Sequence, residues 1–334
     1  MKNLARKRLL EIGLPLPRND DWMYFPVSKL SSLEIPAVEN SSVENKNALG
    51  IETESNAAAL LPIAFGAYPK ITTIAPNETE RGILKNRDEF SHSIFKVSTG
   101  AKLYLEILGN KSERNFSCER IDLELETDAE VFLFFHEQIS EETTHLTHIR
   151  ITLAQNAKLH SNMLFTGKGI SRTSSEIFLN GNSSFADYRS FAILTDKASE
   201  HSHLKIHHNA RETKSTQFAR HFLSNSSFAS YDGSVLAGEN CPQVNSSQLI
   251  NTILQDNAKV SVKPNLKIYH DEVECSHGCT CGSFDEEELF YLQSRGLTEE
   301  KAKKILTRSF AREVFPDSLP YSKRISEELS KLGF

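Results

Sequence analysis

The sequence lacks several features that mark specialised classes of protein. Its longest apolar run, Val131 to Phe135, is far too short to cross a bilayer. Its formal charge is −6, so it lacks the excess of Lys and Arg that is typical of proteins binding nucleic acid or anionic lipid. We therefore expect neither nucleic acid nor a membrane as a partner.

Neither the N-terminal stretch nor the cysteine pattern is typical of a secreted protein. The N-terminal stretch MKNLARKRLL has no apolar core followed by a small-residue cleavage site, so we expect no signal peptide. The five cysteines are an odd number with three of them crowded together, which favours reduced thiols over a disulfide framework. These observations predict a cytoplasmic protein. No phosphate-binding glycine loop, G-x-S-x-G or His-Glu-x-x-His is present, so we expect no ATP hydrolysis by this chain.

A seven-residue phrase recurs from about residue 90 onward. It has an apolar residue, two others, then Asn, Asp or Gly, a small residue, any residue and usually another apolar one, as in LETDAEV and LAQNAKL. The residues predicted to form the turns are Gly100, Asp128, Asn156, Asn182, Asn209, Asp232 and Asn257. One further copy, FLSNSSF at 222–228, falls out of phase with the rest.

These phrases predict a solenoid. Asn, Asp and Gly tolerate a left-handed backbone, so each phrase is typical of a strand, a tight turn and a second strand. Alternating stretches between the phrases, such as SHLKIHH, suit half-buried strands. A mostly β repeat of about 26 residues indicates coils stacked along an axis. We therefore predict a parallel β-helix over residues 90–270, with an irregular β-sandwich as the alternative.

Helices are predicted at both ends of the chain. The first ten residues form an amphipathic pattern that ends at Gly13, and the polar residues 36–57 are predicted to be a loop or linker. The whole chain then divides into an N-terminal helical and linker segment (1–60), a β-helix core (61–282) and a C-terminal helical subdomain (283–334).

The C-terminal subdomain is predicted to contain three short helices. Ser283 and Glu286 form a capping box for the first helix, which ends at Gly296. Thr298 caps the second helix, and the third follows Pro320. Their apolar residues exceed what three short helices can bury among themselves, so either the solenoid or a partner protein must cover them.

The stretch CSHGCTCG at 275–282 is the most concentrated candidate site. Side chains alternate along a strand, so Cys275, His277, Cys279 and Cys281 are predicted to share one face. Residues two apart on a strand are separated by about 6.5–7 Å, which is too far for four of them to surround one ion. The strand therefore predicts one or two ligands of a site that another chain completes. The alternative is that Cys279 and Cys281 are small buried core residues.

Other histidines are weaker candidates. His201, His203 and His207 share one strand face with Lys205 and are predicted to be a solvated stripe. His145 and His148 are three apart, on opposite faces of a strand, and cannot chelate one ion together. Cys118 and Cys241 stand alone in the sequence.

Two stretches carry a resemblance to a known family. The segment from Leu254 to Phe315, with SHG at 276–278, resembles the signature of the SufB/SufD family, on its SufD branch. GLPLPRNDDWMYFPVSKL at 13–30 also resembles the entry segment of that family. The resemblance implies a right-handed parallel β-helix between helical segments. It also implies a non-catalytic scaffold for iron–sulfur cluster assembly.

The resemblance further implies partners and site residues. A SufB-like subunit is expected to pair with the β-helix, with a transient iron–sulfur cluster forming at the interface near His277, supported by Cys275. A SufC-like ABC-type ATPase is expected to dock on the C-terminal helices. The residues expected to contact it are Leu289, Phe290, Leu292, Ala302, Ile305, Leu306 and Phe310. The resemblance also allows reduced flavin in the full complex and a homodimer of the isolated chain.

Two rival functions remain open from the residues alone. One is a β-helix enzyme acting on polysaccharide, which would display stacked rows of Asp, Arg or Lys on an exposed face. The other is a stand-alone zinc or iron protein that uses the CSHGCTC segment without a partner.

Overall fold

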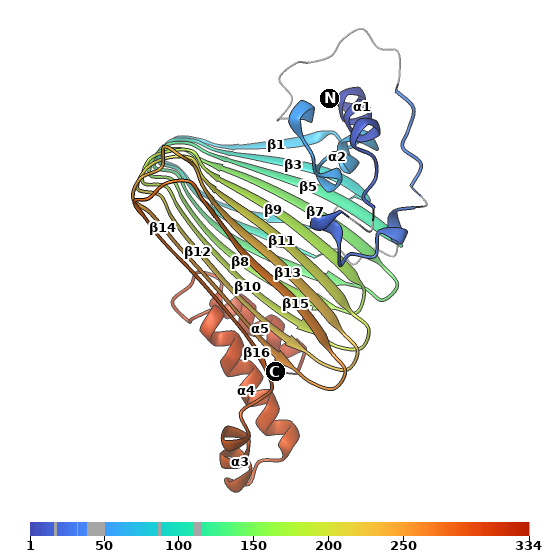
Figure 1. Ribbon diagram of the computed structural model, residues 1–334, viewed down its shortest axis with the longest axis vertical. Coiled ribbons are helices and arrows are strands. Elements are labelled where there is room, and N and C mark those ends of the chain that lie inside the picture. The colour runs from blue at the N-terminus through green and yellow to red at the C-terminus, as the bar shows by residue number, and fades with distance from the viewer. Residues whose placement is uncertain (17–18, 32, 39–50, 86–87, 110–114, 334) are drawn as a thin grey trace.

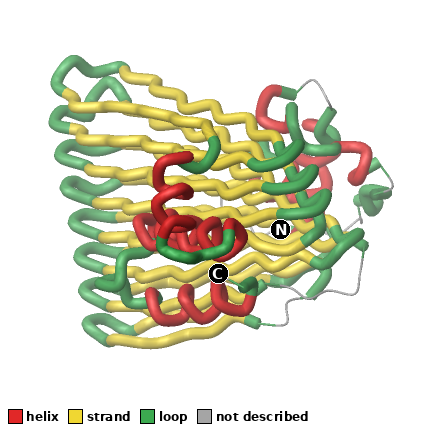
Figure 2. The backbone as a smooth tube through the Cα atoms, turned by 90° about the horizontal axis from the view of Figure 1, so that it is seen from below, coloured by secondary structure: helices red, strands yellow, loops and turns green. Residues whose placement is uncertain are grey.

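Two parallel sheets form the centre of the molecule (Figure 1). The computed structural model describes residues 1–334 apart from 17–18, 32, 39–50, 86–87, 110–114 and 334. The chain alternates between two eight-stranded sheets, so each coil gives one strand to each sheet, and the paired strands run parallel. Figure 2 shows the coils stacked as successive rungs. The predicted mainly β solenoid with helices at both ends is confirmed, and the irregular sandwich is excluded.

The strands follow one another between the two sheets. Sheet A contains β1 (Pro69–Ile74), β3 (Phe90–Val97), β5 (Phe116–Leu125), β7 (Thr144–Leu153), β9 (Ile170–Leu179), β11 (Ser199–His208), β13 (Phe228–Ala237) and β15 (Lys259–Ile268). Sheet B contains β2 (Thr79–Leu84), β4 (Lys102–Leu108), β6 (Glu130–Ile139), β8 (Lys158–Gly167), β10 (Phe185–Leu194), β12 (Lys214–Leu223), β14 (Val244–Leu254) and β16 (Val273–Gly282).

The helices lie outside the coils. The α-helices are α1 (Lys2–Ile12), α2 (Ala57–Ala64), α3 (Glu286–Ser294), α4 (Glu299–Val314) and α5 (Ser322–Lys331). Three 3-10 helices occur in the N-terminal segment, namely η1 (Asp20–Trp22), η2 (Val27–Leu30) and η3 (Ile51–Thr53). The first helix ends as predicted, at Gly13, which has a φ of 75°. Helix α2 was not predicted, and most of the predicted linker (residues 39–50) lies outside the described residues.

Tight turns join the strands at one edge of the coils. Asp128 and Asn156 both have positive φ, 59° and 55°, as their phrases predicted. The N–H of Asp128 donates to the carbonyl of Gln155 (2.9 Å), and the N–H of Asn156 donates to that of Asn182 (2.9 Å). The Asn156 amide also donates to the Asp128 carboxylate (2.9 Å). Hydrogen bonds between turns therefore continue the stacking of the strands.

Among the later predicted turn positions, Asn182 and Asn257 do lie in turns, although the left-handed residue is a neighbour of each, whereas Asn209 and Asp232 are misplaced. The left-handed residue is Ser183 where Asn182 was predicted, and Glu212 where Asn209 was predicted. Asp232 lies inside β13, and Asn257 lies in a turn at the opposite edge of the coils. Asn257 falls in the opposite row because the solenoid has a row of turns along each edge, and both rows favour the same residue types. The copy at 222–228 was out of phase because its Asn225, with a φ of 59°, belongs to the opposite row.

The inside of the coils is the main apolar core. Aliphatic and aromatic side chains from both sheets meet there, from Ile74 at the first coils to Ile250 and Ala258 at the last ones. Most buried positions of one strand are followed by a buried position of the next strand in the same register. Every coil therefore buries its inner face against its neighbours, as expected for a solenoid.

The N-terminal segment covers the outer face of sheet A. Leu9 of α1 and Leu60 of α2 share a second apolar cluster with Cys118 of β5 and Leu146 of β7. Figure 1 shows these N-terminal helices (blue) beside the first strands of sheet A. The part of the outer face under these helices is thus an internal surface of the protein.

The prediction of a solvated histidine stripe is wrong for this reason. His201 and His203 are 1% and 3% exposed, because the N-terminal segment lies over them. The ring of Phe25 contacts that of His201, with centroids 5.5 Å apart. The Asp21 carboxylate is 3.4 Å from Nε2 of His203 and accepts a hydrogen bond from Lys205 (3.1 Å).

The C-terminal helices cover the outer face of sheet B. Phe134, Phe191 and Phe222 of the sheet form a third apolar cluster with Val314 of α4 and Ile325 of α5. The apolar residues of these helices were expected to pack either on the solenoid or on a partner protein, and they pack mainly on the solenoid. The cover is sheet B's outer face, with helix α3 left projecting from the body (Figure 1).

The cap of α3 differs from the prediction. Asp285, not Ser283, is the N-cap, and its carboxylate accepts hydrogen bonds from the N–H groups of Glu287 and Glu288. Phe284 is buried against Phe222, with ring centroids 5.7 Å apart, which keeps the chain extended for one residue more. Thr298 caps α4 as predicted.

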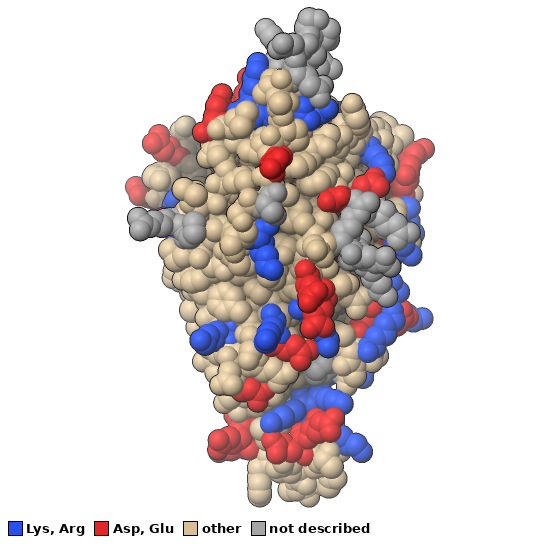
Figure 3. Space-filling view, turned by 90° about the vertical axis from the view of Figure 1, so that its right-hand side faces the viewer, with Lys and Arg blue, Asp and Glu red and all other residues tan. Residues whose placement is uncertain are grey.

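The surface carries charges of both signs. On the face drawn in Figure 3, Lys and Arg side chains are interspersed with Asp and Glu, and no broad region has a single sign. None of the helices in the described part of the chain combines the length and apolar character needed to span a bilayer. The cytoplasmic location stays a prediction.

Buried histidines predict that the fold is sensitive to acid. Burial lowers the pKa of His201 to about 3, and those of His208 and His221 to about 4, from an ordinary value of 6.5. Between these values and 6.5 the unfolded chain binds more protons than the folded one, so the free energy of unfolding falls as pH falls. Replacing one such group, as in His221→Gln, should reduce the slope of stability against pH by about 1.4 kcal/mol per pH unit. Urea unfolding between pH 7 and 4 measures this, and an unchanged slope would contradict it.

Candidate functional site

The last coil leaves the solenoid open. β15 pairs only with β13, and β16 pairs only with β14, so both are edge strands of their sheets. No described strand covers the inner face of this coil, where Val260 and Val262 of β15 are half-buried against the end of the core. Unpaired edges and an exposed inner face are features that a second polypeptide can use.

The predicted row of soft side chains lies on this inner face. In β16, Cys275, His277, Cys279 and Cys281 are the register partners of four β14 residues. These partners are Ser246, Gln248, Ile250 and Thr252, all of which are buried. The row therefore continues the buried positions of the coils behind it, and the predicted alternation of the strand is confirmed.

The row is nevertheless exposed, because no further coil covers it. His277, Cys279 and Cys281 are exposed, and Cys275 is half-buried against Cys241 and Val244. Burial raises the pKa of the Cys275 thiol, which lowers its share of thiolate. The alternative in which Cys279 and Cys281 are buried core residues is therefore wrong.

A hydrogen-bonded column of polar side chains leads to His277 from inside. The Gln217 side-chain oxygen accepts hydrogen bonds from the Gln248 amide (3.0 Å) and the Tyr231 hydroxyl (3.4 Å). Gln248 is the register partner of His277, so the histidine is the next position of this polar row. A Cβ on Gly233 would lie 2.7 Å from the Gln217 oxygen, which explains why glycine stands there. The hydrogen-bonded Gln217–Gln248 pair therefore lies in the two coils directly behind His277.

The row does not make a metal centre by itself. Across the described residues, three or more possible metal ligands gather within 4.8 Å in two places, and neither includes a residue of β16. Tetrahedral zinc needs ligand atoms about 2.0–2.3 Å from the ion, so β16 in this conformation offers too few convergent ligands. The arrangement can supply part of a site for a soft or borderline metal, with the remaining ligands coming from elsewhere.

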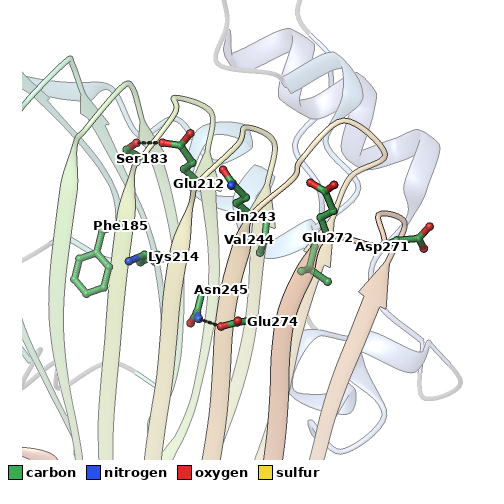
Figure 4. A pocket seen from close by; sticks show the side chains of 11 residues that line it. Ser183, Phe185, Glu212, Lys214, Gln243, Val244, Asn245, Asp271, Glu272 and Glu274 are labelled. Atoms are coloured by element: carbon green, nitrogen blue, oxygen red, sulfur yellow. Dashed lines mark hydrogen bonds between the residues drawn. The ribbon is translucent and has the colours of Figure 1, made fainter.

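A polar groove lies beside the start of β16, at the edge of the coils. Figure 4 shows its side chains pointing out from successive turns and strand ends, with Ser183 bonded to Glu212 and Asn245 bonded to Glu274. Its volume is about 1040 Å³, and it is rich in carboxylates. The lining acidic residues are Glu212, Asp271, Glu272 and Glu274. No three of the described carboxylates there lie within 4.8 Å of one another, so the groove also offers no convergent set of metal ligands.

The predicted docking residues lie mainly on the projecting helix pair. Phe290 of α3 and Ile305 of α4 are exposed, by 72% and 46%. Leu289, Leu292, Leu306 and Phe310 are half-buried. Ala302 is fully buried. An exposed Tyr291 adds to this apolar surface, and the sequence reasoning missed it.

The two clusters of possible metal ligands were also missed. One contains Glu54, His148 and Glu176, and the other contains Glu119, Glu137 and His145. His145 and His148 do lie apart, as predicted, but each meets residues from other elements. No spacing in the sequence indicates these groupings, because their members come from different coils or from the N-terminal segment.

Comparisons with known proteins identify relatives of this chain. Residues 82–310 match the family model described as SUF system FeS cluster assembly, SufBD core domain. The Escherichia coli protein named iron–sulfur cluster assembly protein SufD is 28% identical, over 92% of this chain and 86% of its own length. Protein ABCI7, chloroplastic, of Arabidopsis thaliana is 30% identical over 54% of this chain and 39% of its own length. A SufBD family protein of Synechocystis is 26% identical over 60% of this chain.

The open row predicts a pattern of thiol reactivity. Cys279 and Cys281 should react with a thiol reagent at the rate of exposed thiols, and Cys275 more slowly, since its thiol is half-buried with a raised pKa. Cys118 and Cys241 should react only after unfolding, because both are buried. Timed labelling followed by mass spectrometry measures this order. Equal protection of Cys279 and Cys241 in the monomer would mean that the row is covered.

Proposed function

This chain belongs to the SufBD family of the SUF iron–sulfur cluster assembly system, and we propose that it acts there as a scaffold subunit of the SufD type. In this role it performs no chemistry of its own; it presents ligands to iron and sulfide while a cluster is built. The observation that carries the proposal is that the exposed His277 and the half-buried Cys275 share one face of the edge strand β16. Imidazole and thiolate are both ligands of iron.

The partner we propose is a SufB-like chain that meets the open end of the solenoid. β15 and β16 offer unpaired backbone groups along two edges, and between them lie half-buried apolar side chains. A second solenoid of similar width could continue both sheets and bury that apolar surface. Ligands from the second chain would then complete the site that β16 begins. When no partner is present, two copies of this chain could pair in the same way.

His277 is the residue that we propose to bind iron. It is exposed at the centre of the row and stands on the hydrogen-bonded Gln217–Gln248 pair. Cys275 is proposed as a supporting ligand, since its thiol is half-buried with a raised pKa. A single imidazole ligand releases a cluster more readily than a full set of thiolates, which suits a protein that must hand its product on.

A SufC-like ABC-type ATPase is proposed to dock on the projecting helix pair. Phe290, Tyr291 and Ile305 form an exposed apolar surface on α3 and α4. Exposed apolar side chains of this size are typical of protein interfaces.

Helix α4 could transmit movement from the ATPase to sheet B. The Arg220 guanidinium of β12 donates to the Phe310 carbonyl (2.9 Å) and lies over the Phe310 ring, 4.2 Å from its centroid. Arg189 of β10 donates to the Val314 carbonyl (3.1 Å). β12 pairs with β14, and β14 pairs with β16. A rotation of α4 driven by ATP would thus act on the sheet that ends at the cluster site. Reduced flavin in the full complex stays a prediction of the family resemblance alone.

A histidine substitution tests the cluster site. His277→Ala should leave the complex with SufB-like and SufC-like chains intact, because the side chain is exposed and adds little to folding. The iron and sulfide content after anaerobic reconstitution should fall severalfold. Thr280→Ala, on the opposite face of the same strand, is the matched control and should behave as the native chain. Undiminished cluster content in His277→Ala would remove this residue from the function.

A second test concerns the ATPase. Removing the whole C-terminal subdomain would uncover the apolar outer face of sheet B, so point substitutions are preferable. Phe290→Ser with Ile305→Ser should weaken binding of the SufC-like chain by about 2 kcal/mol or more if both are central contacts. Titration calorimetry measures the affinity of the two chains. Tyr68→Ser, which alters another highly exposed aromatic residue, is the control. Native affinity in the double variant would place the docking surface elsewhere.

A further inference from the structure

A second cluster of possible ligands lies on the outer face of sheet A, away from β16. His148 projects from β7, Glu176 from the neighbouring strand β9, and Glu54 from the N-terminal segment between η3 and α2. One ligand atom of each lies within 4.8 Å of the other two. Three parts of the chain, far apart in sequence, therefore meet at one point.

The histidine of this cluster, His148, is buried without hydrogen-bond partners for its ring. Its side chain has no exposed surface, and neither of its ring nitrogens has a hydrogen-bond partner in the described part of the structure. A buried polar atom without a partner costs about 1–3 kcal/mol, so such atoms usually have a bound water or ion. Burial also lowers the pKa of His148 well below its ordinary value, which keeps the ring neutral and its lone pair available.

The two carboxylates of the cluster also favour the binding of a cation. The pKa of Glu176 is raised, first by burial and then by the nearby charge of Glu54. Glu54 is held in place because its Oε1 accepts hydrogen bonds from the N–H groups of Ser55 and Asn56 (both 2.9 Å). The two like charges therefore face each other in a site from which water is largely excluded.

Three cationic side chains, Lys205, Arg150 and Arg120, lower the pKa of Glu176 by their charge, but burial and Glu54 outweigh them. Arg120 also binds both oxygens of Asp122, at 2.8 and 2.9 Å. Arg150 is 3.9 Å from the Glu176 carboxylate and lies over the ring of Phe178, 4.4 Å from its centroid. Neither arginine is in a position to satisfy the His148 lone pair, since a guanidinium would have to donate to it and no such bond is formed.

We propose that Glu54, His148 and Glu176 bind a divalent transition-metal ion that fastens the N-terminal segment to sheet A. One imidazole and two carboxylates are a common ligand set for ions of the zinc class. Binding requires the three ligand atoms to close from within 4.8 Å to the shorter spacing around an ion, which side-chain rotation can supply. The ion is structural in this arrangement, because the site is buried under the N-terminal segment and is formed partly by it.

Zinc binding by the whole chain tests the site, provided that the thiols of β16 are removed first. In a background with Cys275→Ser, Cys279→Ser and Cys281→Ser, chelator-stripped protein should bind one equivalent of Zn²⁺ and gain thermal stability from it. Glu54→Gln and Glu176→Gln should each weaken this binding by about tenfold or more. His207→Gln, on the same sheet face but outside the cluster, is the matched control and should bind as the background does.

The result that would overturn the proposal is equally specific. Zinc binding that is absent in the thiol-free background, or equal in Glu54→Gln and the background, would show that the cluster is no metal site. If His148→Ala fails to fold, the two glutamine variants still decide the matter, since each nearly preserves shape. Cobalt(II) absorption provides a second measurement, because its visible spectrum reports an imidazole and oxygen ligand set. None of these readouts depends on cluster assembly at β16.

Discussion

The parallel, in-register stacking of coils is the constraint on which the rest of the structure depends. Each strand must pair with the strand one coil before and one coil after it, so the last coil necessarily has unpaired edges. The chain does not cover these edges with either of its helical segments in the described residues. The exposed His277, Cys279 and Cys281 lie at one of the two ends where the stacking of coils stops.

The two helical segments take different places on the solenoid. The N-terminal segment buries charged and histidine side chains of sheet A, and the C-terminal helices bury the phenylalanines of sheet B. Both outer faces are therefore used to hold the chain together, whereas the last coil and the projecting α3 are left largely uncovered in the described residues.

The sequence predicted the parts of the structure that depend on local patterns. The turns at Gly100, Asp128 and Asn156 follow from residues that accept a left-handed backbone, and the row on β16 follows from strict alternation along a strand. Asn257 was assigned to the wrong row because two rows of turns share one residue preference, and Asp232 was misplaced because the same residue type also occurs inside a strand. The burial of His203 and the meeting of Glu54 with His148 could not be predicted, because both depend on where the N-terminal segment lies.

The central claim is that β16 offers only part of an iron site until another chain meets it. The most direct measurement is iron content after anaerobic reconstitution, on the separated monomer of this chain and on its complex with a SufB-like chain. The account predicts essentially no retained iron on the monomer and a bound cluster on the complex, with an imidazole nitrogen among its ligands in X-ray absorption. A monomer that retained a full cluster by itself would contradict it.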